Sequence, residues 1–479
     1  MPIMNKNILI PTLVLAFSST SMGFFDPGSD VGREKKFFTT TANNSEVCVL
    51  PKHLELADDQ FTTNEMYSKE DFEKEEKLCS LDFHANTSVI CPKFSSTSAA
   101  THVYEIRPTE LVDNDNGKNK FQNAESCFNL GQKEPKRADT DITFPERFSK
   151  FKQNESKNPL TPKNISAPLA YYHLSRALGN ILKVPVAVLR TMDVEKHREL
   201  IPIFNSIPKK SKGTTLGWDG FDKLHNGPRN DSGLYTVDKK QIYGVLLKGG
   251  GTDWASKLDE MAKIMETKFY KKTVTAEPMQ EQFFAADTES MRRKEILLST
   301  DFADMVLLDT LLEQMDRYSG GNIDQYFVYW NGEEYLSQKK YDKLKEKAAN
   351  DGEKFVEPLK ITRLSIQDND AGLLNYKPSI EKNVKNWNRL ATIKHFSSST
   401  YFRLQNLAKL DKSKLISFLM TEALLTSAQA TQVFNNIQKA AKEMKAACLN
   451  ESIFVDLDVD MILKNQADKE FSKQNCTQL

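Results

Sequence analysis

The stretch DFADMVLLDTLLEQMDRYSGGN (301–322) carries the clearest information about the fold. Its apolar residues recur at spacings of three and four, at Met305, Leu308, Leu312 and Met315. That spacing puts them on one face of an amphipathic helix. We expect the helix to run into Asp316-Arg317 and to be broken by Gly320-Gly321.

Two segments downstream have the composition of strands. YFVYW (326–330) is aromatic and β-branched, and the turn residues Asn331-Gly332 follow it. ITRLSI (361–366) is a second strand, and the acidic run DND (368–370) comes directly after its end. The sequence therefore predicts acidic residues at loop positions beside a helix end and a strand end.

These residue types match the needs of phosphoryl transfer. One carboxylate, Asp368, would hold Mg²⁺ or Mn²⁺ on the nucleotide phosphates, and another, Asp316, would orient the attacking hydroxyl and accept its proton. The amide of Asn322 would complete the metal shell. The alternative interpretation is that all three are solvated turn residues, as acidic residues at strand ends usually are.

Several segments extend this pattern along the chain. They are MDR (315–317), QDNDAG (367–372), FSSSTYFRLQNLAKLDKSKLISFLMTEAL (396–424), ITFPERFSKFK (142–152) and LAYYHLSRALGNILKVPVAVLRTMD (169–193). Together they resemble the secretory-pathway kinases, a family that includes the Golgi casein kinase, the glycosaminoglycan xylosylkinase and their Four-jointed relatives. The resemblance covers about Asp141 to Cys448, with an unmatched middle.

The resemblance implies an α+β, two-lobed atypical protein-kinase-like fold, with a small β-rich N-lobe and a larger helical C-lobe. It implies that Asp316 is the catalytic base and that Asp368 binds the metal, with Asn322 or Asp370 as second ligand. It aligns Lys152 with the lysine that holds the α- and β-phosphates of ATP. The alternative for Lys152 is a solvated strand edge shared with Lys150.

The resemblance also places Ile242, Tyr243 and Gly244 at the hinge between lobes, where backbone groups would meet the adenine. Arg317 is expected to brace the catalytic loop. The chain departs from the family at Pro168, where most active members carry a Glu that pairs with the phosphate-binding lysine. Proline is tolerated in a first helical turn but carries no charge. Glu155 or Glu146 would have to substitute from a loop.

Composition indicates an exported protein. Residues 1–23 have a basic start, a short apolar core and small residues at the cleavage positions, which is typical of a signal peptide and too short for a membrane span. The chain has 65 Lys and Arg against 65 Asp and Glu, so no global positive field favours nucleic acid. We expect a secreted or periplasmic protein, in a bacterial source, without a membrane span.

The cysteine count predicts disulfides. Six cysteines in an exported chain suggest paired thiols, and the simplest arrangement pairs them within an early group of four and a late group of two: Cys48, Cys79, Cys91 and Cys127, then Cys448 and Cys476. Six cysteines allow 15 connectivities, so this pairing is one among several.

The expected organisation has a Cys-bearing extension (24–100), an N-lobe (101–240), a C-lobe (241–450) and a C-terminal tail (451–479). Within the C-lobe, the Lys/Glu-rich insertion 337–357 is expected to be a solvated helical hairpin or a substrate-docking flap.

The leading hypothesis is a kinase that uses ATP with Mn²⁺ or Mg²⁺ to phosphorylate a protein or glycan hydroxyl. The rivals are a pseudokinase, which binds nucleotide or activates a partner without transfer, and a kinase fold that transfers a nucleotidyl group. Acceptor contacts lie in variable loops, so the sequence does not identify the acceptor.

Overall fold

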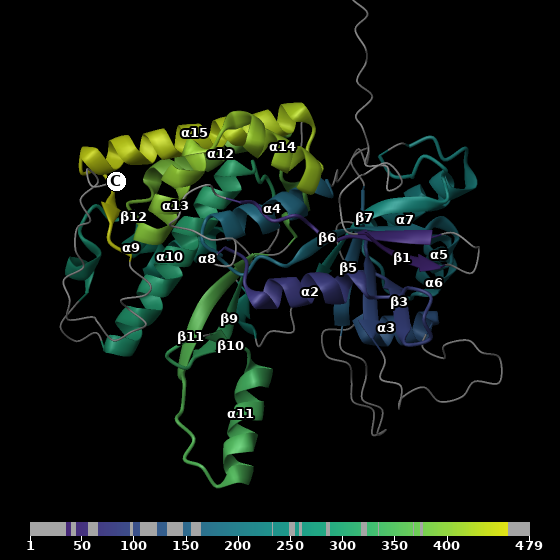
Figure 1. The fold of residues 1–479 in the computed structure, drawn as a ribbon, viewed down its shortest axis with the longest axis horizontal. Coiled ribbons are helices and arrows are strands. Elements are labelled where there is room, and N and C mark those ends of the chain that lie inside the picture. Colours follow the sequence, from purple (N-terminus) through teal and green to yellow (C-terminus); the bar gives the residue numbers. More distant parts are fainter. Residues whose placement is uncertain are drawn as a thin grey trace, which may run out of the picture.

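The structure is a computed structural model with a mixed α+β fold. The residues it describes are 35–39, 45–55, 66–95, 99–105, 122–131, 147–154, 164–231, 233–248, 254–257, 261–283, 288–317, 323–333, 335–366, 368–373 and 377–457. The strands of the largest sheet gather on one side of the molecule, and the long helices lie on the other side together with a smaller sheet (Figure 1). No helix within these ranges is long and apolar enough to cross a membrane.

The strands on the first side form one antiparallel sheet of seven, in the order β1-β2-β6-β7-β5-β4-β3. Their bounds are β1 (Lys35–Thr39), β2 (Ser45–Val49), β3 (Ser88–Pro92), β4 (Thr101–Glu105), β5 (Arg147–Gln153), β6 (Ala187–Asp193) and β7 (Gln241–Lys248). Strands β3, β4 and β5 are neighbours both in sequence and in the sheet, while β7 lies between β5 and β6. The β5–β6 connection is therefore a crossover.

Helices surround this sheet and complete the β-rich part of the molecule. They are α2 (Lys69–Cys79), α3 (Ala124–Gly131), α4 (Ser166–Ala177), α5 (Val194–Arg198), α6 (Leu200–Ser206) and α7 (Lys212–Asn226). Helix α4 makes the crossover from β5 to β6, and every one of its residues is buried. In Figure 1 it lies between the sheet and the helices of the other side.

The helical part is built on a second, smaller sheet and a set of long helices. Its strands are β8 (Trp254–Lys257), β9 (Ile323–Trp330), β10 (Tyr335–Leu336) and β11 (Leu359–Ile366), and a parallel pair joins β12 (His395–Phe396) to β13 (Phe454–Val455). Its helices are α8 (Met261–Glu266), α9 (Lys268–Val274), η2 (Met279–Gln282), α10 (Glu289–Leu311), α11 (Gln338–Asp351), η3 (Asn369–Ala371), α12 (Lys377–Thr392), α13 (Ser398–Lys409), α14 (Lys412–Glu422) and α15 (Ser427–Leu449).

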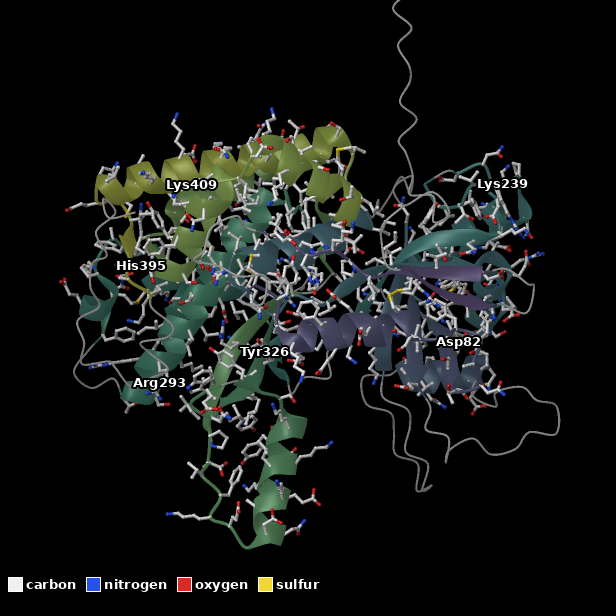
Figure 2. All side chains as sticks on the ribbon, viewed as in Figure 1. Asp82, Lys239, Arg293, Tyr326, His395 and Lys409 are labelled. Atoms are coloured by element: carbon white, nitrogen blue, oxygen red, sulfur yellow. A yellow bond between two sulfur atoms is a disulfide. The ribbon has the colours of Figure 1, made fainter. Side chains whose placement is uncertain are left out.

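The two parts share the molecule's main hydrophobic core. Residues of α4, such as Tyr171 and Leu174, are fully buried together with Leu308 of α10 and Leu419 of α14. In Figure 2, Tyr326 and His395 lie on the helical side, whereas Asp82 and Lys239 lie on the side of the large sheet. Helix α4 thus packs into the region where the two parts meet.

The helix predicted to reach Asp316-Arg317 ends earlier, at Leu311. Side-chain amides bind carbonyl oxygens of its last turn: Asn436 donates to Leu311 O at 3.1 Å, and Asn386 donates to Asp309 O at 3.4 Å. Because these donors satisfy the backbone, the chain can leave the helix, and residues 312–317 form a loop. Met315 is therefore not part of the helical face that its spacing predicted.

Other expected elements are present with shifted bounds. The predicted strands 326–330 and 361–366 are the cores of β9 and β11, which pair antiparallel along their full length. The insertion is one helix, α11, followed by a return without regular structure over 352–358, rather than a helical hairpin. It projects from the end of the β9–β11 pair (Figure 1).

The expected domain boundaries cut through the large sheet. Strands β1, β2 and β3 lie before residue 101, yet they pair in the same sheet as β4 to β7. Strand β7 begins at Gln241 but has β5 on one side and β6 on the other. The segment 24–100 is consequently part of the β-rich unit where it is described, and that unit extends through Lys248.

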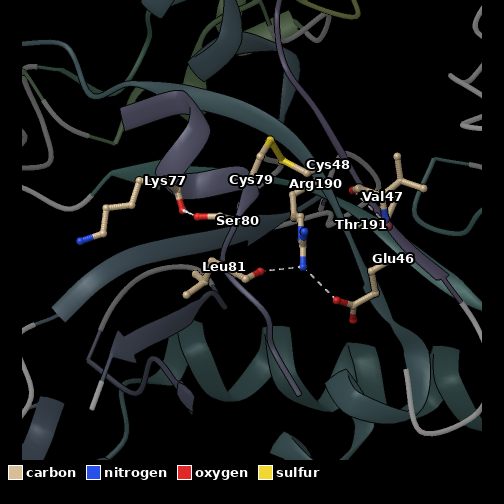
Figure 3. Close-up of a disulfide and its surroundings, with 9 residues drawn as sticks. All are labelled: Glu46, Val47, Cys48, Lys77, Cys79, Ser80, Leu81, Arg190 and Thr191. Carbon is tan, nitrogen blue, oxygen red and sulfur yellow. Dashed lines mark hydrogen bonds and ion pairs between the residues drawn. A yellow bond between two sulfur atoms is a disulfide. The ribbon is translucent and has the colours of Figure 1, made fainter. Parts of the chain in front are cut away.

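Two disulfides link described cysteines, and both lie within the early group. Cys48–Cys79 joins β2 to the end of α2, and Cys91–Cys127 joins β3 to α3. Beside the first, the buried Arg190 of β6 donates to Glu46 at 3.0 Å and to Leu81 O at 3.1 Å (Figure 3). The two bridges close loops of 31 and 36 residues. Each loop restricts the conformations of the unfolded chain and so stabilises the folded protein by about 3–4 kcal/mol.

The late pair is described only in part. Cys448, near the end of α15, is disulfide-bonded. Cys476, its expected partner, lies outside the described residues. The prediction that the chain contains disulfides is therefore confirmed.

Candidate functional site

The large sheet and the segment after β11 meet at a buried lysine. Lys152 of β5 is 4% exposed, and its Nζ donates to Asp368 Oδ1 and to Asp370 Oδ2, both at 2.7 Å. These carboxylates lie 216 and 218 residues away in the chain. The structure thus brings together three of the residues that the sequence proposed for phosphate and metal binding.

A second lysine reaches the same carboxylate. Lys150 Nζ donates to Asp368 Oδ1 at 2.6 Å, and its side chain is 13% exposed. Residues two apart in a strand point to the same face, so β5 presents Lys150 and Lys152 together. The alternative that these lysines form a solvated strand edge is therefore wrong.

The residue between the two lysines explains a glycine in the neighbouring strand. Phe151 points to the opposite face of β5 and is fully buried. A Cβ on Gly244 of β7 would lie 2.3 Å from the Phe151 ring and 2.8 Å from the backbone oxygen of Lys152. Gly244 therefore lets β7 approach β5 closely enough to hold the strand that carries both lysines.

This position conflicts with the hinge role expected for Ile242, Tyr243 and Gly244. All three lie inside β7, where each pairs with β6, and Ile242 and Tyr243 are buried. The strand leaves the sheet after Lys248. The N–H and C=O groups that pair two strands of a sheet are not available to bind an adenine. A segment that joins the two parts would therefore begin at the end of β7 rather than near its start.

The acidic segment after β11 is fixed by its backbone. Asp368 has a left-handed conformation, with φ 51° and ψ 53°, and the short helix η3 follows it. Leu373 N donates to Leu312 O at 3.0 Å, and a Cβ on Gly372 would lie 2.9 Å from that same oxygen. Only glycine at position 372 allows the two segments to come this close. The hydrogen bond from Leu373 then connects the acidic segment to the loop after α10.

An arginine strengthens the same connection. Arg317 is fully buried, and it donates to Asp309 of α10 at 3.0 Å and to Asn369 Oδ1 at 2.6 Å. Tyr171 of α4 donates to Asp309 Oδ1 at 2.7 Å. Helix α4, helix α10, the loop and η3 therefore meet in one polar network. This agrees with the expectation that Arg317 braces the loop.

The network also positions the residue proposed as catalytic base. Asp316 directly precedes Arg317, and Asp368 directly precedes Asn369. The hydrogen bond from Arg317 to Asn369 therefore links the loop that carries Asp316 to the segment that carries Asp368. Asp316 is half-buried, and its backbone N–H donates to the Gln314 side chain at 3.1 Å. The side chain of Asp316 is thus attached to a well-fixed backbone.

The charges in this cluster perturb one another. Burial on its own would raise the pKa of Asp368, but the ammonium groups of Lys150 and Lys152 hold that pKa well below its ordinary value. Burial would lower the pKa of Lys152, but Asp368 and Asp370 raise it above its ordinary value. Burial lowers the pKa of Lys150, with added repulsion from Lys152 and Lys93 that opposes the attraction of Asp368.

The donor set fits a divalent cation that is shared with a nucleotide. Within the described residues, no group of three or more His, Cys, Asp or Glu side chains could hold a metal by itself. Mg²⁺ in nucleotide sites usually takes one or two carboxylates and completes its shell with phosphate oxygens and water. Asp368 and Asp370 share Lys152 and supply such a pair of carboxylates. Asn322, the expected amide ligand, lies outside the described residues.

The proline that replaces the expected glutamate lies in the first turn of α4. Pro168 is buried, and the side chains of α4 include no carboxylate. Glu155 and Glu146, the proposed substitutes, lie outside the described residues. Lys152 nevertheless has two carboxylate partners, because Asp368 and Asp370 both contact it.

Sequence reasoning missed three members of the site. They are Tyr171, Asp309 and Asn369, to which the sequence analysis gave no role. Their roles depend on contacts between segments 52 to 138 residues apart. Lys150 entered the sequence analysis only in the solvated-edge alternative, although the two-residue period of β5 places it on the same face as Lys152.

No protein-family model matches the chain, and no curated protein matches it significantly.

Proposed function

We propose that this protein is an exported phosphotransferase with a two-lobed, protein-kinase-like fold, which transfers the γ-phosphate of ATP to a hydroxyl group of a protein or glycan. The observation that carries the proposal is the contact of Lys152 with Asp368 and Asp370, at 2.7 Å each. A buried lysine on a sheet and acidic residues on a loop opposite are the two groups that protein kinases use to hold nucleotide phosphates and their metal.

The strand order supports the same proposal. In protein kinases the phosphate-binding lysine lies on the third strand, and the helix that follows this strand regulates activity. Here Lys152 lies on β5, the third strand of the β3-β4-β5 meander, and α4 follows. Helix α10, the loop with Asp316, the β9–β11 pair and Asp368 then follow in the order of a kinase's catalytic segments.

In the proposed reaction each residue has one task. Mg²⁺ or Mn²⁺ on the donor phosphates would neutralise their negative charge, with oxygens of Asp368 and Asp370 as protein ligands. Lys152 would exchange its contact with Asp368 for the α- and β-phosphates. Asp316 would accept the acceptor's hydroxyl proton as the new oxygen–phosphorus bond forms, the bond from the γ-phosphorus to the bridging oxygen breaks, and ADP leaves.

Export is part of the proposal. The apolar N-terminus predicts a signal peptide, and the disulfides Cys48–Cys79 and Cys91–Cys127 belong in an oxidising compartment. Disulfides are rare in proteins that stay in the reducing cytosol. We therefore assign the protein to the periplasm or the extracellular space.

One observation favours a second function, nucleotide binding without transfer. Pro168 gives α4 no carboxylate for Lys152. In protein kinases, the pairing of this lysine with a helix glutamate accompanies the active state. A pseudokinase would retain the cluster around Asp368 and would bind ATP with metal, yet would not phosphorylate an acceptor.

Intact-mass spectrometry of the purified protein, incubated with ATP and Mn²⁺ with and without candidate acceptors, tests the proposal. A kinase adds one or more phosphates to itself or to an acceptor, and Asp316→Asn abolishes this while ATP binding survives. Addition of a nucleotide would indicate nucleotidyl transfer. Binding of ATP without any mass change on a broad acceptor set would favour the pseudokinase.

A further inference from the structure

The acidic segment engages one lysine more than the proposed reaction uses. Lys150 and Lys152 both donate to Asp368 Oδ1, at 2.6 and 2.7 Å. The proposed function assigns Lys152 to the donor phosphates and Asp368 to the metal. It gives no task to Lys150, although its side chain is only 13% exposed.

The arrangement of charges requires Lys150 to change partner during a reaction. Within the described residues, Asp368 is the only side chain that accepts a hydrogen bond from Lys150. Once an oxygen of Asp368 is bound to a divalent cation, its negative charge no longer compensates the nearby ammonium group. A largely buried ammonium group is costly unless an anion pairs with it. The ligand that brings the metal must therefore also bring an anion to Lys150.

The geometry lets one ligand satisfy both lysines. The two ammonium groups contact the same carboxylate oxygen, so they lie close together on one face of β5. A chain of phosphate groups offers several adjacent oxygens with negative charge, and lysine is a common partner for phosphate. A single hydroxyl or a nucleobase would leave one of the two ammonium groups without a counter-charge.

A third cation belongs to the same surface. Lys93, in the connection from β3 to β4, is near enough to act on the charges of both Lys150 and Asp368. Its backbone is anchored, because its N–H donates to Ala100 O at 2.8 Å and its carbonyl accepts from Trp218 at 3.3 Å. The surroundings of Asp368 are therefore more cationic than a single phosphate-binding lysine would make them.

We propose that Lys150 is a second phosphate-binding lysine, which leaves Asp368 when the donor and its metal bind, so that the site selects donors by the length of their phosphate chain. This inference rests on the proposed function. It adds to it the substrate class: the donor is recognised mainly as a polyphosphate, and inorganic tripolyphosphate with Mn²⁺ should occupy the same site as ATP.

Titration calorimetry with AMP, ADP, ATP and tripolyphosphate, each with Mn²⁺, tests the inference on the full mature chain. We expect affinity to rise with phosphate count, and tripolyphosphate to bind within about tenfold of ATP. Lys150→Met should weaken ATP and tripolyphosphate roughly ten- to a hundredfold, the usual worth of one hydrogen bond to a charged group. The loss for AMP should be smaller.

Two further variants separate this role from general effects. Lys196→Met removes a lysine of α5 with similar exposure, 18%, which pairs with Glu199 directly after that helix, and it should leave all four affinities unchanged. Lys150→Arg keeps the charge and should retain most of the binding. If Lys150→Met fails to fold, the wild-type affinities for AMP, ADP, ATP and tripolyphosphate still test the inference, because equal affinities would overturn it.

The outcomes distinguish the inference from the function on which it rests. If Lys150→Met binds ATP as well as the wild type, or more tightly, Lys150 only neutralises Asp368 and the inference is wrong. If wild-type affinity is the same for AMP and ATP, phosphate count does not select the donor. If the wild type binds none of the four ligands, the proposed function fails, and the inference fails with it.

Discussion

Replacing Arg317 by Met should destabilise the protein strongly, because it leaves a carboxylate buried without its main counter-charge. Arg317 and Asp309 are 0% and 1% exposed, and the guanidinium donates to Asp309 at 3.0 Å. Breaking a buried ion pair by removing one partner costs about 3–5 kcal/mol. We expect Arg317→Met to lower the free energy of unfolding by that amount, measured by urea denaturation with circular dichroism.

A double-mutant cycle makes the test specific. Asp309→Asn keeps an acceptor for Tyr171 but removes the buried charge. Because the double variant leaves no uncompensated ion, it should be less destabilised than the sum of the single variants, with a coupling of about 1–3 kcal/mol. A cost below about 1 kcal/mol for Arg317→Met, or strict additivity, would refute the reasoning.

The same variant should also disturb the site, since Arg317 contacts Asn369 at 2.6 Å beside Asp368. We expect weaker binding of ATP with Mn²⁺. The matched control is Arg363→Met, which breaks the pair with the fully buried Asp301 at 2.7 Å. This control should lose comparable stability without weakening nucleotide binding.

Three further predictions follow from individual residues. Burial raises the pKa of Asp304 to about 7. Ionisation of this carboxyl therefore lowers the free energy of unfolding as pH rises from about 4 to 7. Asp304→Asn should have an unfolding free energy up to about 4 kcal/mol above that of the wild type above pH 7, and the same value below pH 4. Gly244→Ala should cost about 1–3 kcal/mol in urea unfolding because its Cβ would overlap the Phe151 ring at 2.3 Å, whereas Gly220→Ala, with nothing within 4 Å, should be neutral or slightly stabilising. Replacing 337–357 by a short linker should leave the protein folded and soluble, because α11 projects from the end of the β9–β11 pair, but it should lower the melting temperature slightly, because it removes Tyr341, which stacks on Tyr329 of β9 at 4.1 Å between ring centroids; a collapse in soluble yield would contradict this.

Local patterns in the sequence predicted the local elements well. The aromatic and β-branched composition of 326–330 marked the core of β9, and the predicted strand 361–366 forms most of β11. These elements form where the residues' own preferences agree with the packing around them. The α+β class, which the resemblance implied, and the disulfides within the early cysteine group, which the cysteine count suggested, were also predicted correctly.

The features that the sequence did not predict depend on contacts between residues far apart in the chain. Helix α10 ends at Leu311 because Asn436, 125 residues away, binds its last carbonyl. Lys150 finds its carboxylate 218 residues further along the chain. The hinge expected at Ile242 was misplaced because pairing with β6, which no local pattern reveals, carries β7 through that position. Such partners are set by tertiary structure, so composition and spacing do not identify them.

The most direct test of the central claim is the melting temperature of the wild type and of Asp368→Asn with ATP, in the presence and absence of Mn²⁺. We predict that ATP stabilises the wild type only with the metal, by about 2.7 kcal/mol at a ligand concentration 100-fold above the dissociation constant. Asp368→Asn should lose most of that metal-dependent gain, because the carboxylate that contacts Lys150 and Lys152 would also hold the metal. Failure of both ATP and ADP to shift the wild-type melting temperature, with either Mn²⁺ or Mg²⁺ over a broad concentration range, would contradict every nucleotide-based function proposed for this site.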